Sequence, residues 1–244
     1  MEEWFKDWFD GDYAAIYEHR DEGEAEQAVA MALAQAPALG SGPVLDLGCG
    51  AGRHLAVLRR TNPQAFGLDL SPTLLALAPA ELRPWLLRGD MRHLPVRDGS
   101  LAGIMLWFTP FGYFPDAQNR ALLLRLRQLL RPGGVLMLDY LNAEYVRDHL
   151  VPQDEAFHPG LKVVSRRTLE GKRIVKHMTL TRLENGTQRE VKESVRLYEA
   201  RELRAMAAES GLGIGLEAGD YQGGPFDPQR STRWIGFLKR DANG

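Results

Sequence analysis

The stretch Pro43-Val-Leu-Asp-Leu-Gly-Cys-Gly-Ala-Gly-Arg-His54 decides the fold of this chain. Its apolar start, 44–47, predicts a short strand that is buried on both faces. The glycines at 48, 50 and 52 then predict a sharp turn into a helix. Because glycine carries no Cβ, the backbone of such a turn can approach a ligand closely. The stretch therefore predicts a strand, a ligand-binding turn and a helix start.

The spacing of the glycines bears on what the turn binds. The dinucleotide fingerprint is G-x-G-x-x-G, and in this chain Arg53 stands where its last glycine belongs. Asp46, two residues before the first glycine, would repel a pyrophosphate but attract an ammonium group. The turn therefore favours a cationic ligand over NAD.

This turn resembles motif I of class I S-adenosylmethionine-dependent methyltransferases, D/E-x-G-x-G-x-G, which here runs from Asp46 to Gly52. Later landmarks of that family follow in order, and the resemblance covers most of the chain. It implies S-adenosyl-L-methionine as cofactor and S-adenosyl-L-homocysteine as product. Methyl transfer is an in-line displacement that gains most from alignment and water exclusion, so we expect no metal.

The end of the second predicted strand carries the clearest candidate for a cofactor contact. Asp69 lies 17 residues beyond Gly52 (69 − 52), close to the ~20 at which an acid reaches ribose hydroxyls. A helix cap is the alternative role, but Ser71 is already suited to cap the next helix. The resemblance further implies that Asp90 accepts from the adenine amino group beside Met91. The full expected cofactor set is Tyr17, Asp46, Gly48, Gly50, Gly52, Arg53, Asp69, Leu70, Asp90, Met91 and Trp107.

The N-terminal segment predicts a lid. Apolar residues recur at helical spacing over 4–20, which indicates an amphipathic element. Tyr13 and Tyr17 each need a partner for the hydroxyl group. The stretch 12–21 resembles the leading segment of small-molecule methyltransferases whose tyrosines close over the cofactor. We therefore expect a helical lid over residues 1–38, with ordinary core packing as the alternative.

The middle of the chain alternates between strand and helix, which predicts a parallel sheet. We expect an α/β fold with a doubly wound, Rossmann-like sheet of seven strands in the order 3-2-1-4-5-7-6. After the fifth strand the rhythm breaks, and an antiparallel β arm of three strands is expected. The expected domain is residues 1–141 and 199–244, the inserted arm is 142–198, and its strands are 161–169, 173–183 and 191–198.

An aromatic loop, 109–114, follows the apolar run 101–108. Ligands bind at the carboxyl ends of parallel strands, so we expect these aromatic rings around a sulfonium group. Relatives that methylate nucleobases or protein amides carry Asn-Pro-Pro-Tyr or Asp-Pro-Pro-Tyr here, and Phe-Thr-Pro-Phe departs from both. A small-molecule methyl acceptor is therefore favoured. Tyr17 and Tyr113 are the candidate catalytic residues, with His177 as a further candidate base.

The composition limits the kinds of partner that this protein is expected to bind. A net charge of −2 over 244 residues gives no general attraction for nucleic acid or anionic membranes. We expect no signal segment, because the N-terminus is acidic, and no membrane span, because no run reaches ~18 apolar residues. The six histidines show no metal-ligand spacing. The single cysteine, Cys49, fits a reducing compartment and is expected to be filler. We expect a cytoplasmic monomer or homodimer that binds neither metal nor membrane.

Three alternatives stay open at this point. A nicotinamide oxidoreductase is disfavoured by the glycine spacing and Asp46. A protein that binds S-adenosylmethionine without catalysis is compatible with the same motifs. An RNA methyltransferase would use the basic arm, although a solvated face is favoured because no aromatic residues are interleaved. The basic residues concerned are Arg166, Arg167, Lys172, Arg173 and Lys176.

Overall fold

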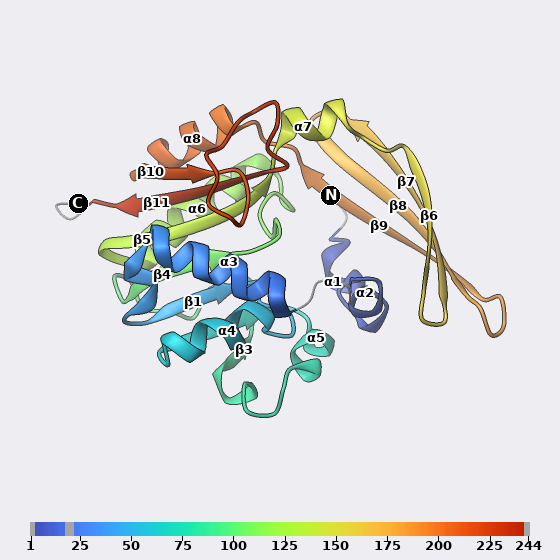
Figure 1. The fold of residues 1–244 in the computed structure, drawn as a ribbon, viewed down its shortest axis with the longest axis horizontal. Helices are drawn as coiled ribbons and strands as arrows, with labels where there is room; N and C mark the ends of the chain where they lie inside the picture. Colours follow the sequence, from blue (N-terminus) through green and yellow to red (C-terminus); the bar gives the residue numbers. More distant parts are fainter. Residues whose placement is uncertain (1–2, 18–21, 242–244) are drawn as a thin grey trace.

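The computed structural model describes residues 3–17 and 22–241 (Figure 1). Residues 18–21, within the lid expected over 1–38, lie outside the described part. The centre is a seven-stranded sheet in the order β10-β11-β5-β4-β1-β2-β3. Read from its other edge, with the strands numbered as they enter the sheet, this is the expected order 3-2-1-4-5-7-6. The predicted α/β fold class is confirmed.

The five strands from β1 to β5 run parallel, and the last two, β11 and β10, run antiparallel to their neighbours. Every residue of β1 and β4 is buried, since helices cover both faces of the sheet. The strand bounds are β1 Val44–Leu47, β2 Ala65–Asp69, β3 Leu86–Arg88, β4 Leu101–Leu106, β5 Leu130–Leu141, β10 Leu212–Ala218 and β11 Arg233–Arg240.

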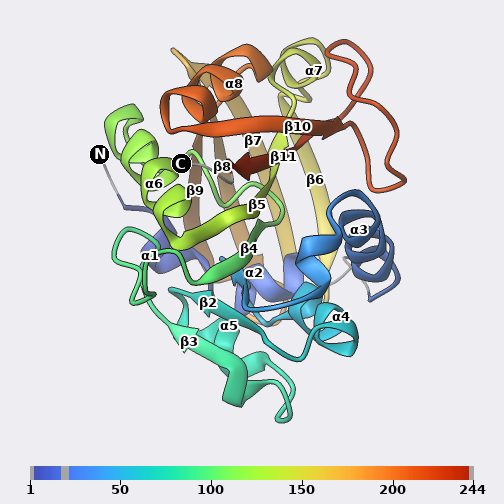
Figure 2. The same ribbon diagram turned by 90° about the vertical axis from the view of Figure 1, so that its left-hand side faces the viewer.

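Helices pack on the two faces of this sheet (Figure 2). One hydrophobic cluster joins α6 and α8 to Leu45 and Leu47, and a second joins α3 and α4 to Val44, as the alternation along a strand requires. The helices are α3 Glu22–Gln35, α4 Arg53–Thr61, α5 Pro72–Leu77, α6 Asp116–Leu129 and α8 Ala200–Glu209, with short 3₁₀ turns at Pro37–Gly40 and Arg83–Trp85. No helix in the described ranges is both long and apolar enough to cross a membrane.

The N-terminal segment forms two short helices, α1 Phe5–Trp8 and α2 Gly11–Ile16. The chain breaks between them because Asp10 caps α2, accepting hydrogen bonds from the backbone of Asp12 and Tyr13. We call residues 3–17 the lid. Figure 1 shows the lid between the central sheet and the arm.

The arm is a separate antiparallel sheet in the order β6-β7-β8-β9. The expectation of three strands was wrong. β6 pairs with β7, but its sequence is mostly polar and exposed, so it shows no alternation of apolar residues. A short helix, α7, precedes the arm and was also missed. The bounds are α7 Ala143–Asp148, β6 Gln153–His158, β7 Leu161–Glu170, β8 Arg173–Arg182 and β9 Gln188–Arg196.

Ion pairs join the lid to the arm. Arg182 of β8 pairs with Asp12 at 2.6 Å, and Arg189 of β9 pairs with Asp10 at 2.5 Å and with Asp12 at 3.1 Å. The indole Nε1 of Trp4 donates to the backbone oxygen of Ser194 at 3.1 Å. The lid is therefore held from the arm side as well as by the core.

Candidate active site

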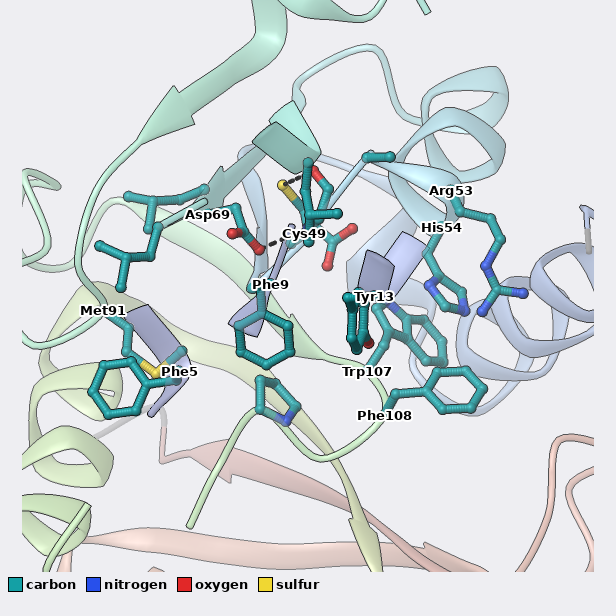
Figure 3. Close-up of a pocket in the computed structure, with 18 of the residues that line it drawn as sticks. Phe5, Phe9, Tyr13, Cys49, Arg53, His54, Asp69, Met91, Trp107 and Phe108 are labelled. Atoms are coloured by element: carbon teal, nitrogen blue, oxygen red, sulfur yellow. Dashed lines mark hydrogen bonds between the residues drawn. The ribbon is translucent and has the colours of Figure 1, made fainter. Parts of the chain in front are cut away.

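A cavity of about 320 Å³ lies at the carboxyl ends of β1, β2 and β4. The lid forms its other wall. In Figure 3 the lid side chains Phe9 and Tyr13 lie between Met91 on one side and Trp107 on the other, and Phe5 lies beside Met91. The expected cofactor set lines this cavity, with Gly52 as the exception. Its members there are Tyr17, Asp46, Gly48, Gly50, Arg53, Asp69, Leu70, Asp90, Met91 and Trp107.

The glycine turn has the conformation that its sequence predicts. Gly48, Gly50 and Gly52 have φ angles of 76°, 56° and 81°, which side chains other than glycine rarely adopt. A Cβ on Gly48 would lie 3.0 Å from the Cβ of Pro110, across the cavity floor. Gly52 is needed for a different reason, because a Cβ there would lie 2.4 Å from Leu82. Gly52 therefore packs α4 against the core and does not line the cavity.

The carboxylate of Asp46 is buried in this turn. Only 2% of the residue is exposed, and its Oδ1 atom has no hydrogen-bond partner within the described structure. Burial and the nearby Asp69 charge raise the pKa of Asp46 to about 7, against the opposing effects of Arg53 and the Leu55 backbone amide. A cation that entered the cavity would satisfy this carboxylate.

Asp69 stands at the end of β2 and is also buried. Its Oδ2 accepts the backbone N–H of Gly50 at 2.8 Å, and its Oδ1 accepts that of Ser71 at 2.8 Å. Burial raises the pKa of Asp69, and these backbone donors partly oppose the rise. Ser71 caps α5, as expected, by accepting from Leu74. Asp69 therefore fixes the glycine turn and still presents its carboxylate to the cavity.

In the loop after β3, Asp90 has a side-chain partner that the sequence did not predict. Both oxygens of Asp90 bind the guanidinium group of Arg92, which lowers the pKa of Asp90 despite its partial burial. Arg92 also pairs with Glu3 of the lid and lies 5.0 Å from the ring centre of Phe114. Asp90 is therefore part of a connection between the cavity floor and the lid, a role that sequence reasoning missed.

Aromatic side chains enclose the cavity. Trp107 stacks on His54 with ring centres 4.5 Å apart and planes at 9°. From the loop after β4, Tyr113 contacts the lid, with its ring centre 4.9 Å from Trp4 and 6.0 Å from Phe9. The lid and this loop thus meet beside the cavity.

The three candidate bases are placed differently. Tyr17 and Tyr113 line the cavity, whereas His177 is exposed on β8 and does not. Phe111, which was expected among the rings at the ligand, is fully buried elsewhere, 5.9 Å from the ring of Tyr198. Cys49 packs over Gly67, and burial raises its thiol pKa, which agrees with its expected role as filler.

A strained turn follows β4. Phe108 and Thr109 both have positive φ angles, 56° and 66°, which are uncommon for such residues. The buried carboxylate of Asp139 accepts the Phe108 backbone N–H at 2.8 Å and the Tyr221 hydroxyl at 2.6 Å, and it pairs with Arg233. Sequence reasoning missed Asp139, Tyr221 and Arg233. The only sequence signal was an acid in the otherwise apolar fifth strand.

Comparisons with known proteins agree with this geometry. Residues 44–134 match the family model described as a methyltransferase domain. The carboxy-S-adenosyl-L-methionine synthase of Chromohalobacter salexigens is 41% identical over 106 residues, 39% of this chain and 38% of that protein. The trans-aconitate 2-methyltransferase of Deinococcus radiodurans is 41% identical over 97 residues, 38% of this chain and 35% of that protein. The chain thus spans less than half of these relatives.

A solved structure extends the likeness to the whole chain. The S-adenosylmethionine-bound amino pentose methyltransferase of Micromonospora echinaspora is 25% identical, with a TM-score of 0.67 over 93% of this chain and 96% of the other. The matched family model contains the glycine turn, Asp69 and Asp90. Residues 44–134 therefore carry a methyltransferase domain, and the chain as a whole has the fold of a solved S-adenosylmethionine-bound methyltransferase.

Proposed function

We propose that this protein is an enzyme that transfers a methyl group from S-adenosylmethionine to a small molecule. The observation that carries the proposal is the buried Oδ1 of Asp46, which has no hydrogen-bond partner in the described structure and lies in a glycine turn beside Asp69. A buried polar atom without a partner is costly unless a ligand satisfies it. An ammonium group supplies both the charge and the N–H donors that this carboxylate needs.

The chain's own residues fit such a ligand. Asp46 and the bare backbone of Gly48 and Gly50 would hold its amino acid part, and Asp69 would accept from the ribose hydroxyls. Leu70, Met91 and the Asp90 loop would contact the adenine, with Trp107 and Arg53 on the opposite wall. When bound, S-adenosylmethionine supplies an electrophilic methyl group.

The protein's contribution to the reaction is geometry and exclusion of water. The lid rings and Tyr113 cover the cavity, so that a nucleophile meets the methyl group in a dry, aligned site. Tyr17 and Tyr113 are the proposed proton acceptors, and both line the cavity, as Tyr13 also does. They would serve an acceptor that holds a proton at neutral pH.

The basic arm gives little support to an RNA acceptor. Arg173 donates to the backbone oxygens of Gly112 and Tyr113 at 3.2 and 3.0 Å, and Arg167 pairs with Asp154 at 2.9 Å. Lys176 donates to the hydroxyl of Tyr17 at 3.0 Å. These cations stabilise the arm and its contact with the core, so we favour a small-molecule acceptor over a nucleic acid.

Calorimetric titration tests the cofactor assignment. We expect S-adenosylhomocysteine to bind with micromolar affinity or better and NADH to show no binding. Binding of NADH alone would replace the proposal with an oxidoreductase. Incubation with S-adenosylmethionine labelled in its methyl group, in the presence of fractionated small metabolites, then separates an enzyme from a protein that only binds the cofactor.

A further inference from the structure

A second cavity adjoins the first. Its volume is about 170 Å³, several times the ~30 Å³ share of one water molecule in the liquid. It lies between the lid, the loop after β4 and the arm. The two cavities share five aromatic residues as a common wall, namely Phe9, Tyr13, Tyr17, Phe108 and Tyr113.

The second cavity contains a carboxylate where the strand pattern predicts an apolar residue. Glu193 shares one face of β9 with Val191 and Val195, both of which pack against the core. Its Oε1 accepts from the indole of Trp8 at 2.6 Å and from the hydroxyl of Tyr17 at 3.4 Å. Two neutral donors thus orient a charged acceptor beside the shared aromatic wall.

The other charged residue of the lining, Arg233, is already neutralised. Its guanidinium group pairs with the fully buried Asp139 and donates to Thr109 at 3.0 Å. Lys176, next to Glu193 in the β8–β9 register, donates to Tyr17 and does not line the cavity. Among the described residues of the lining, the charge not balanced by an ion pair is that of Glu193, and the nearest cation, Lys176, reaches it only through the hydroxyl of Tyr17. This arrangement favours a ligand with N–H or O–H donors over an anion.

We propose that the second cavity is the acceptor site and that it takes a small hydroxylated amine whose nitrogen is methylated. This inference rests on the proposed function. The lone pair of the neutral amine forms the new C–N bond while the C–S bond breaks with its electrons going to sulfur, and the surplus proton leaves the nitrogen for water. Glu193 is a positioning residue that binds the amine through its N–H groups.

We infer nitrogen over oxygen as the methyl-accepting atom from the bases that line the second cavity. Among the described residues that line the second cavity there is no histidine. An alcohol would need a strong base to become a nucleophile, whereas an amine needs only to lose its ammonium proton. A carboxylate and three tyrosine hydroxyls are sufficient to orient an amine and pass that proton to solvent.

Ligand-observed saturation-transfer NMR on the protein loaded with S-adenosylhomocysteine tests the proposal. The probes are a set of amino monosaccharides and amino alcohols, glucose as an uncharged match, and trans-aconitate as a tricarboxylate. We expect at least one amine to bind and to bind more tightly than glucose, and trans-aconitate to give no signal. Binding of trans-aconitate, or no signal from any amine, would overturn the proposal.

Two variants locate the bound amine. Glu193→Gln keeps an acceptor for Trp8 but removes the charge, and we expect at least about fivefold weaker amine binding. Val195→Trp fills the second cavity and should abolish binding. Glu190→Gln, at an exposed residue of the same strand, is the matched control and should bind as the parent does. Unchanged amine binding in Glu193→Gln would show that Glu193 does not position the amine.

Calorimetry with S-adenosylhomocysteine on each variant separates a wrong acceptor assignment from a wrong cofactor assignment. Normal S-adenosylhomocysteine binding in Val195→Trp shows that the variant is folded, so that a lost amine signal reports the cavity. If the parent protein fails to bind S-adenosylhomocysteine, the proposed function itself is wrong. If it binds S-adenosylhomocysteine but no amine, only the acceptor assignment is wrong.

Discussion

The Oδ2 atom of Asp139, on β5, accepts the backbone N–H of Phe108 at 2.8 Å. This contact holds the turn after β4 in its left-handed conformation, where Phe108 is part of the wall between the two cavities. Strain of this kind persists only where the surroundings fix it. Asp139 therefore shapes both cavities from a position outside their linings.

Replacing Asp139 should show how much the turn depends on it. In Asp139→Asn the largely buried Arg233 loses its counterion, and we expect a loss of stability of about 3–5 kcal/mol. Tyr221→Phe removes one donor to the same carboxylate and should cost about 1 kcal/mol. Chemical denaturation measures both. A neutral effect of Asp139→Asn would mean that the pair contributes nothing to the turn.

Asp69 should contribute to cofactor binding as well as to the stability of the glycine turn. We expect Asp69→Ala to weaken S-adenosylhomocysteine binding by at least ~1.5 kcal/mol, because a charged partner for two hydroxyl groups is lost. Asp98→Ala, at an exposed aspartate that pairs with Arg125, is the control and should leave the affinity unchanged. Unchanged calorimetric affinity in Asp69→Ala would remove the ribose assignment.

Asp46 should make both binding and stability depend on pH. Its pKa is raised from 3.8 to about 7, so between these values the folded protein holds a proton that the unfolded chain has lost. Stability from this group therefore falls as the pH rises from 4 to 7. A cationic ligand needs the ionised form, so S-adenosylhomocysteine should bind more weakly at pH 6 than at pH 8.

The variant Asp46→Asn separates these two effects. Without ligand at pH 8 it should be more stable than the parent by roughly 2 kcal/mol, since a buried charge is removed. Its affinity for S-adenosylhomocysteine should fall by tenfold or more and lose the dependence on pH. Denaturation and calorimetry at pH 6 and pH 8 check both. A destabilised Asn variant at pH 8 would show that the ionised carboxylate is well satisfied without ligand.

Sequence reasoning succeeded where the signal is local. The glycine turn, Asp69 and the Ser71 cap all follow from spacing within neighbouring strand–turn–helix units, and the alternation of elements predicts the parallel sheet. The site contacts themselves stay predictions, although the cavity brings their residues together. The division into domain and arm is likewise a prediction that the fold alone does not test.

Sequence reasoning failed where distant strands converge. Asp139, Tyr221 and Arg233 come from two strands and a loop, and no local pattern links them. Phe111 was expected at the ligand because of its aromatic neighbours, but the turn at Phe108 directs it into the core. β6 was missed because an exposed edge strand needs no apolar alternation.

The lid gives the last prediction. Its acidic residues are held by Arg182 and Arg189 of the arm, and its rings meet Tyr113 above the first cavity. The arginine side of these ion pairs is partly exposed, whereas Trp8 and Ile16 of the lid are buried in the core. Loss of an ion pair should therefore loosen the lid and let it open more often without ligand. Arg189→Ala should therefore increase amide exchange in the lid, whereas Arg166→Ala, on the exposed part of β7, should not.

Ligand binding should reverse this opening. With S-adenosylhomocysteine added, hydrogen exchange should show protection of amides 8–17 together with 48–53, because the cofactor would contact the glycine turn and the lid at once. The amides of β6 should change little, since that strand lies at the far edge of the arm sheet from β9, which holds Glu193. Protection confined to 48–53 would mean that Tyr13 and Tyr17 are ordinary packing residues. Both tyrosines would then have to be withdrawn from the site, and Tyr113 would be the remaining candidate for the proton acceptor.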